Sequence, residues 1–120
     1  MNITDFKASL AQFIGTMYYH KLSLFPVLAT DGVKYFCEKA SAFWLFDDMS
    51  AVTLDKAKNE EFIVAAATSK DDECDVVYDD GNENKIYEQH YDYTDLPEGE
   101  WKFYISNYPA QKVIMLPSEY

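Results

Sequence analysis

The chain has 120 residues, 48% of them hydrophobic and 17% aromatic, which is enough for one domain with a real core and excludes global disorder. Its net charge is −11 and it contains no arginine, which argues against direct binding of nucleic acid or of anionic membranes. With two cysteines, no signal-peptide pattern and no apolar stretch near the ~20 residues that cross a bilayer, we expect the cytoplasm.

The N-terminal segment predicts one short helix. Apolar residues recur at helical spacing over residues 5–14. Thr4 supplies an N-cap and Gly15 a stop. Residues 17–28 are also apolar, but their spacing is irregular and Pro26 prevents a long helix there.

A second and stronger helical pattern follows. It opens at Thr30 or Asp31 and keeps an apolar stripe to about Thr53, as expected of a helix that faces a sheet. The pattern fits either one helix or two helices that meet near Ser41. Residues 55–60 then form a polar connection to the rest of the chain.

The C-terminal half changes to a period of two, which predicts strands. Their expected bounds are residues 62–67, 74–78, 86–93, 101–106 and 112–116. Residues 79–82 are expected to form a hairpin turn, because Asp-Gly readily adopts positive φ angles, and residues 107–110 form the last turn. In the third strand an aromatic face alternates with a polar one, namely Tyr87, Gln89, Tyr91 and Tyr93 against Glu88, His90 and Asp92.

This order of elements predicts an α+β fold in a single domain, residues 1–120. The helical part, about 1–58, would pack on one face of an antiparallel sheet of about five strands. The strands form a β-meander over about 61–117, and the other face of the sheet would be solvated.

The negative charge is confined to one segment. Residues 71–100 hold twelve acids and one lysine, a net charge of −11, whereas residues 1–70 carry −1 and residues 101–120 carry +1. Because this segment covers the second and third strands, its charges are expected to share a face or an edge. Unpaired carboxylates at this density repel one another, so a basic partner would stabilise them. A solvated surface that keeps the protein soluble is the alternative.

Several segments resemble a known family. They are Phe13–Thr16, Thr30–Phe36 with its continuation to Asp47, Asp80–Asn82, Tyr93–Pro97 and Leu116–Tyr120. Their order is similar to that in a family of short uncharacterised proteins of phage, plasmids and other mobile bacterial elements. The family is a domain of unknown function, so the resemblance implies no catalytic residue. It implies an origin on a mobile element. Small acidic proteins of such elements often inhibit a host system, commonly a defence nuclease. The acidic residues 71–75 depart from the family pattern.

A calcium site is one alternative to the hairpin turn. Asp80, Asn82 and Asn84 imitate the first three ligand positions of a calcium loop. However, Lys85 stands where that loop needs glycine, and Tyr91 stands where it needs a bidentate glutamate. The hairpin turn accounts for the presence of Asp80 and Asn82 without a metal ion.

The cysteines and histidines raise the question of zinc binding or thiol catalysis. Cys37, Cys74, His20 and His90 could form one zinc site or a nucleophile–base pair, but no two of them have the short spacing of structural zinc ligands. Nothing in the sequence supplies a cation or a helix N-terminus to lower a thiol pKa. Cys37 fits an apolar helix face equally well as a packed residue.

We therefore predict a non-enzymatic inhibitor without metal or cofactor, most concretely an anti-CRISPR or antirestriction protein. It would bind a basic host protein or nuclease complex, as a monomer or a homodimer, without contacting nucleic acid or membrane. The predicted binding residues are Asp71, Asp72, Glu73, Asp75, Asp79, Asp80, Glu83, Glu88, Asp92 and Tyr91. A self-associating structural module is the alternative, followed by a small metal- or thiol-dependent enzyme.

Overall fold

The computed structural model describes residues 2–107 and 111–120. Its elements are α1 (Ile3–Leu10), β1 (Val27–Ala29), α2 (Asp31–Ala40), α3 (Phe43–Lys56), β2 (Phe62–Lys70), β3 (Glu73–Asp79), β4 (Lys85–Tyr91), β5 (Gly99–Asn107), β6 (Lys112–Met115) and a 3₁₀ turn, η1 (Pro117–Glu119). The α+β class is confirmed. Residues 108–110 of the predicted last turn lie outside the described residues.

One mostly antiparallel sheet holds all six of these strands, in the order β1-β6-β5-β2-β3-β4. The five predicted strands are present, and the hairpin at residues 79–82 joins β3 to β4. They do not form the predicted β-meander, because β5 returns to pair with β2 and leaves β4 at the edge of the sheet. The sixth strand, β1, was not predicted because it has only three residues. It lies in the irregular apolar segment and pairs in parallel with β6, about 85 positions later in the chain, so no local pattern could indicate it.

The first helix starts earlier and ends earlier than predicted. Asn2, not Thr4, is the N-cap, and its side-chain oxygen accepts a hydrogen bond from the backbone N–H of Asp5 at 3.2 Å. The helix ends at Leu10 instead of Ile14. The Ile14 side chain is 83% exposed and so adds no buried surface that would stabilise a longer helix, and short helices depend on such burial.

The second helical pattern is two helices, which confirms one of the two alternatives. Thr30 is the N-cap of α2. At its other end Ser41 adopts a left-handed conformation with φ of 52°, which stops α2 and turns the chain into α3. The helix α3 then continues to Lys56, three residues beyond the predicted end.

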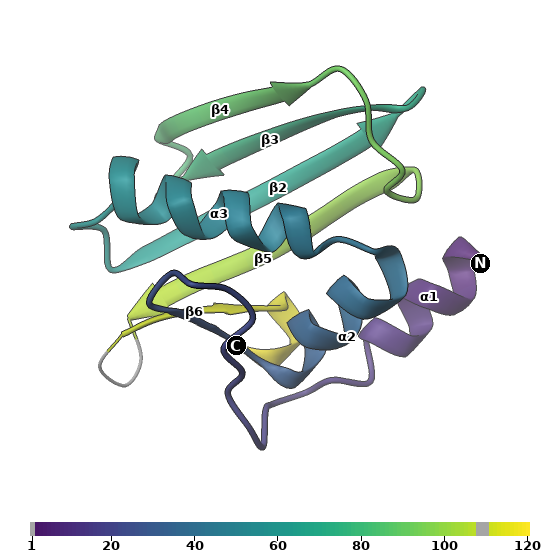
Figure 1. Ribbon diagram of the computed structural model, residues 1–120, viewed down its shortest axis with the longest axis horizontal. Helices are drawn as coiled ribbons and strands as arrows, with labels where there is room; N and C mark the ends of the chain where they lie inside the picture. Colours follow the sequence, from purple (N-terminus) through teal and green to yellow (C-terminus); the bar gives the residue numbers. More distant parts are fainter. Residues whose placement is uncertain (1, 108–110) are drawn as a thin grey trace.

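Burial alternates along the central strands, so the sheet has two different faces. Trp101, Phe103 and Ile105 of β5 are buried, and the Phe36 ring of α2 lies 5.6 Å from Trp101 and 5.1 Å from Phe103. Figure 1 shows α1, α2 and α3 on the same side of the sheet, with α3 running along its middle strands. We call the other side, which none of these helices covers, the open face.

Candidate functional site

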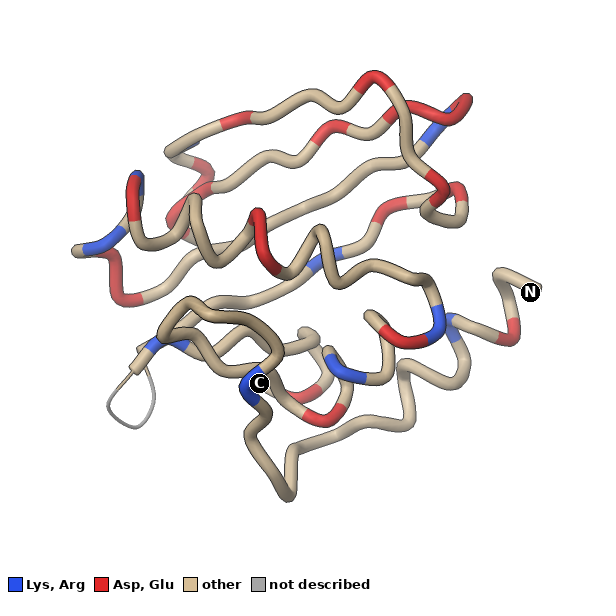
Figure 2. Tube along the Cα trace, in the orientation of Figure 1, with Lys and Arg blue, Asp and Glu red and all other residues tan. Residues whose placement is uncertain are grey.

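The acids of β3 and β4 gather on the open face. Cys74, Val76 and Tyr78 of β3 are buried on the helix side, so the alternate residues Glu73 and Asp75 point to the open face, where both are exposed. Figure 2 shows the acidic residues, in red, along these two strands and their turns.

Strand pairing adds two more carboxylates to this surface. Asp75 lies opposite His90 on β4, and Val77 lies opposite Glu88. Asp92 follows directly after β4 and is fully exposed. We call the four carboxylates on this side of the hairpin the acidic face: Glu73, Asp75, Glu88 and Asp92.

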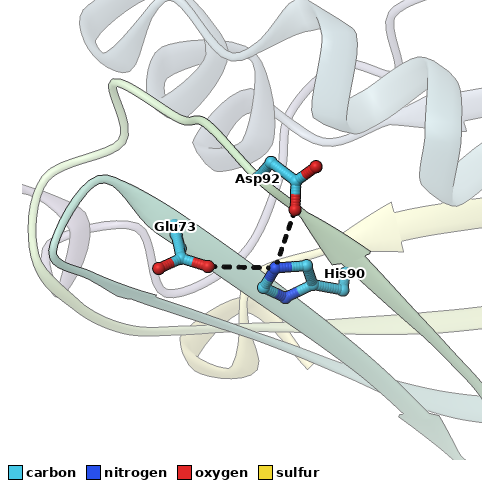
Figure 3. Close-up of side chains that lie close together, drawn as sticks. All are labelled: Glu73, His90 and Asp92. Atoms are coloured by element: carbon cyan, nitrogen blue, oxygen red, sulfur yellow. Dashed lines mark ion pairs between the residues drawn. The ribbon is translucent and has the colours of Figure 1, made fainter.

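His90 lies in the middle of the acidic face (Figure 3). Its Nδ1 is 2.7 Å from Asp75 Oδ1, and its Nε2 is 3.1 Å from Glu73 Oε1 and 3.3 Å from Asp92 Oδ1. The hydrogen bond with Asp75 raises the pKa of His90, desolvation opposes this, and the three negative charges raise the pKa further. A protonated His90 would thus act as an internal counter-ion.

The remaining predicted acids lie at the two ends of the β3–β4 hairpin. Asp71 and Asp72 form the turn that precedes β3, beside the acidic face, and both have positive φ angles. Asp79 and Asp80 lie at the far end of β3, with Glu83 in the next turn. Seven strand residues separate the two ends, which is about 20 Å, so the predicted residues are spread along the hairpin and do not form one tight cluster.

Asp79 and Asp80 build the turn between β3 and β4. Asp79 Oδ1 accepts from the Gly81 N–H at 2.7 Å, and Asp80 Oδ1 accepts from the Asn82 N–H at 2.9 Å. The Asn84 side chain donates to Asp80 Oδ2 at 3.0 Å, and this bond is the main reason why the pKa of Asp80 is lowered. The residues that imitate a calcium loop are therefore engaged in turn formation.

Tyr91, the one predicted binding residue that is not an acid, does not lie on the acidic face. The structure places its side chain on the helix side of the sheet, where its hydroxyl donates to Asp48 Oδ2 at 2.7 Å and its ring lies 5.2 Å from Trp44. The alternation along β4 is the physical reason, because Tyr91 falls between His90 and Asp92, which point to the other face. The same alternation in the sequence already marked His90 as polar, but only the β3–β4 register shows that it meets Asp75.

The surroundings of both cysteines disfavour the reactive thiolate form. Burial, followed by the charges of Asp47 and Glu38, raises the pKa of Cys37 to about 12. Burial, followed by the charge of Asp75, raises the pKa of Cys74 to about 11. Little thiolate would exist at neutral pH, which disfavours a thiol nucleophile.

The cysteines and histidines considered for zinc or thiol chemistry do not form one group within residues 2–107 and 111–120. Cys37 lies on α2, Cys74 on the helix side of β3, and His90 on the open face. His20 pairs with Asp31 at 2.7 Å. In the same part of the chain, no helix is long and apolar enough to cross a membrane.

Residues 4–120 match the model of a family of unknown function, DUF6876. The chain belongs to the DUF6876 family. This confirms the resemblance to an uncharacterised family. No curated protein matches this DUF6876 chain. A solved structure that is similar to it is the crystal structure of a protein of unknown function from Enterococcus faecalis, with 13% sequence identity and a TM-score of 0.59. The match covers 86% of this chain and 98% of that one, and at this identity it shows the fold alone.

Two of the segments that resemble the family meet at the start of α2 in this DUF6876 chain. The Glu119 carboxylate accepts from the Thr30 hydroxyl at 2.6 Å and from the Gly32 N–H at 2.9 Å. A Cβ atom on Gly32 would lie 2.6 Å from Glu119 Oε1 and 2.7 Å from Leu116 Cδ1, so a larger residue would push the Glu119 carboxylate away from these hydrogen bonds. These contacts tie the C-terminal segment to the N-terminus of α2. They give both of these family-like segments a structural role.

Proposed function

We propose that this chain is a non-enzymatic binding protein whose acidic face engages a Lys- and Arg-rich surface of another protein. The observation that carries the proposal is the grouping of four exposed carboxylates on the open face of a two-stranded hairpin. The most concrete version is a counter-defence inhibitor, an anti-CRISPR or antirestriction protein from a phage or plasmid. In that version the carboxylates take the place of phosphates in a basic groove.

The spacing of the carboxylates supports this function. Same-face residues are about 7 Å apart along a strand, and neighbouring strands lie about 5 Å apart, so Glu73, Asp75 and Glu88 form a regular array. Paired strands hold such an array in place, which reduces the conformational entropy lost on binding. Long basic side chains from a partner can reach several carboxylates at once.

Apolar side chains beside the acidic face supply the centre of an interface. Val77 lies between Ala66 of β2 and Glu88 of β4, and all three share the open face. Val77 and Ala66 are partly exposed. Protein interfaces commonly combine an apolar centre with a charged rim, and this combination favours a protein partner over free cations.

The test is an affinity capture from host lysate at low salt, with elution by a salt gradient. The variant Glu73→Gln/Asp75→Asn/Glu88→Gln/Asp92→Asn removes the acidic face. The matched control Glu38→Gln/Asp55→Asn/Glu60→Gln/Glu61→Gln removes the same charge from exposed positions elsewhere. We expect wild type and control to retain a nucleic-acid-binding defence complex that elutes at moderate salt, because screening weakens such contacts.

Capture of the same complex by the acidic-face variant would contradict the proposal. So would capture by wild type that does not change with salt. Retention of scattered basic proteins alone would identify the acidic face as a solvated surface.

Self-association is the second candidate, because β4 is an edge strand of the sheet. An exposed edge can pair with the same edge of another copy. Such pairing would bring the acidic residues of β4 in one copy close to those of β4 in the other, and this repulsion is why we prefer a basic partner. Light scattering of the purified chain at increasing concentration distinguishes the two, since a dimer without any partner would favour self-association.

A further inference from the structure

Three atoms of metal-ligand type converge at one end of the β3–β4 hairpin (Figure 3). Glu73 Oε1, His90 Nε2 and Asp92 Oδ1 all lie within 4.8 Å of one another. His90 Nε2 is 3.1 Å from the glutamate oxygen and 3.3 Å from the aspartate oxygen. Two ligands that each lie about 2.1 Å from one ion, at octahedral or tetrahedral angles, are about 3.0–3.4 Å apart. The two distances from His90 Nε2 are therefore in the range of neighbouring ligands of a single ion.

A fourth residue orients the histidine. Asp75 Oδ1 lies 2.7 Å from His90 Nδ1, so the Nε2 side of the ring faces Glu73 and Asp92. A carboxylate on the far nitrogen is the arrangement that fixes ring orientation and tautomer in many metal sites. Asp75 is directly opposite His90 in the strand pairing, so the backbone register holds this contact.

The backbone on either side of Asp92 is held in place although Asp92 lies outside the strand. It follows Tyr91, whose hydroxyl donates to Asp48 at 2.7 Å on the helix side of the sheet. Two residues later, the Thr94 N–H donates to the Asp72 carbonyl at 2.7 Å, which ties this segment to the turn before Glu73. The ligand-bearing backbone is thus braced on both sides, as a preorganised site requires.

We propose that Glu73, His90 and Asp92 bind a divalent transition-metal ion of the Zn²⁺ type, with Asp75 as the residue that positions His90. One imidazole and two carboxylates suit Zn²⁺ and its neighbours in the first transition row, whereas Mg²⁺ and Ca²⁺ prefer oxygen ligands alone. Three side chains leave the remaining coordination positions to water, or to a group from a partner. The site needs no basic partner, so it stands independently of the proposed function.

A protonated His90 that donates to the surrounding carboxylates would produce the same three distances. The two arrangements differ in one measurable respect, because a metal site takes up one equivalent of Zn²⁺ through the imidazole. Carboxylates alone would collect cations diffusely and would not distinguish Zn²⁺ from Mg²⁺.

The test is calorimetric titration of ZnCl₂ into the full chain after removal of metals by a chelator. We expect one Zn²⁺ per chain. His90→Gln should weaken the affinity at least tenfold, and the positioning variant Asp75→Asn should weaken it about tenfold. The control Glu83→Gln, which removes an exposed acid in the far turn, should leave the affinity unchanged. In NMR spectra the His90 ring signals should shift on addition of Zn²⁺ and stay unchanged on addition of Mg²⁺.

Three results would overturn the proposal: no stoichiometric binding by wild type, equal affinity in wild type and His90→Gln, or displacement of Zn²⁺ by an equal concentration of Mg²⁺. The variants change exposed side chains, and circular dichroism would check that each is folded. No partner enters this experiment, so its failure leaves the proposed partner-binding function untouched, and the reverse is also true.

Discussion

At the scale of single residues, Asp31 connects the loop before β1 to the first turn of α2. His20 Nε2 lies 2.7 Å from Asp31 Oδ1, and the Met17 N–H donates to Oδ2 at 2.9 Å. In return, the Asp31 N–H donates to the Thr16 hydroxyl at 2.9 Å. Partial burial raises the pKa of this carboxyl, but the hydrogen bonds from His20, Met17 and Thr16 outweigh it and lower the pKa.

This lowered pKa predicts an acid dependence of stability. The ionised Asp31 stabilises the fold fully above its unfolded pKa, near 3.8, and this stabilisation is lost as pH falls through the lower folded pKa. We expect Asp31→Asn to unfold at lower urea than wild type at pH 5, and the difference to shrink as pH falls to about 3. Urea unfolding at several pH values measures this, with the exposed Asp5→Asn as control. A difference that stays constant with pH would contradict the assignment.

At the scale of elements, the β2–β3 turn has a strained backbone because two aspartates adopt positive φ angles there. Asp71 and Asp72 occupy both central positions with φ of 53° and 65°, the conformation that Asn-Gly adopts most easily. Local pattern did not indicate this turn, because Lys70-Asp71-Asp72-Glu73 contains no glycine or asparagine. The hairpin between β3 and β4 was predicted correctly because Gly81 marks it.

We therefore expect Asp71→Asn/Asp72→Gly to raise the free energy of unfolding by about 1 kcal/mol, because glycine adopts positive φ without a steric penalty. The control Asp71→Asn/Asp72→Asn removes the same charges but adds no glycine. Its free energy of unfolding should rise by a smaller amount. Urea unfolding compares the three chains, and equal gains in both variants would show that charge repulsion, and not backbone strain, destabilises this turn.

At the scale of the whole molecule, the charge distribution sets the response to salt. The chain carries −11 overall, with the excess in residues 71–100, mostly on β3, β4 and their turns. Within the described residues His90 and Lys85 are the basic groups paired with acids there, and Lys85 Nζ lies 2.8 Å from Glu88. Added salt screens the repulsion among the remaining carboxylates.

We expect the free energy of unfolding of wild type to rise between about 0.05 M and 0.5 M NaCl, because the Debye length falls several-fold over this range. The variant that removes the acidic face should show a smaller rise, whereas the matched control of four acids elsewhere should resemble wild type. Urea unfolding at each salt concentration gives, for each of the three chains, the slope of the free energy of unfolding against salt. Equal slopes in all three chains would mean that the acidic face does not destabilise the fold.

Local pattern in the sequence was enough to predict the α+β class and five of the six strands of the described residues, and it offered the break near Ser41 as one of two alternatives. These features depend on residues a few positions apart, through capping, alternation and turn chemistry. Alternation also determined which residues of β4 share a face. The charge count located the acidic segment between residues 71 and 100.

Only the tertiary structure decided what depends on distant parts of the chain. The short β1 exists because β6 pairs with it, and Glu119 closes the start of α2 from the other end of the sequence. The cluster around His90 exists because the register sets it opposite Asp75. A periodic pattern indicates which way a side chain points, but the long-range pairing of strands decides which side chains it meets.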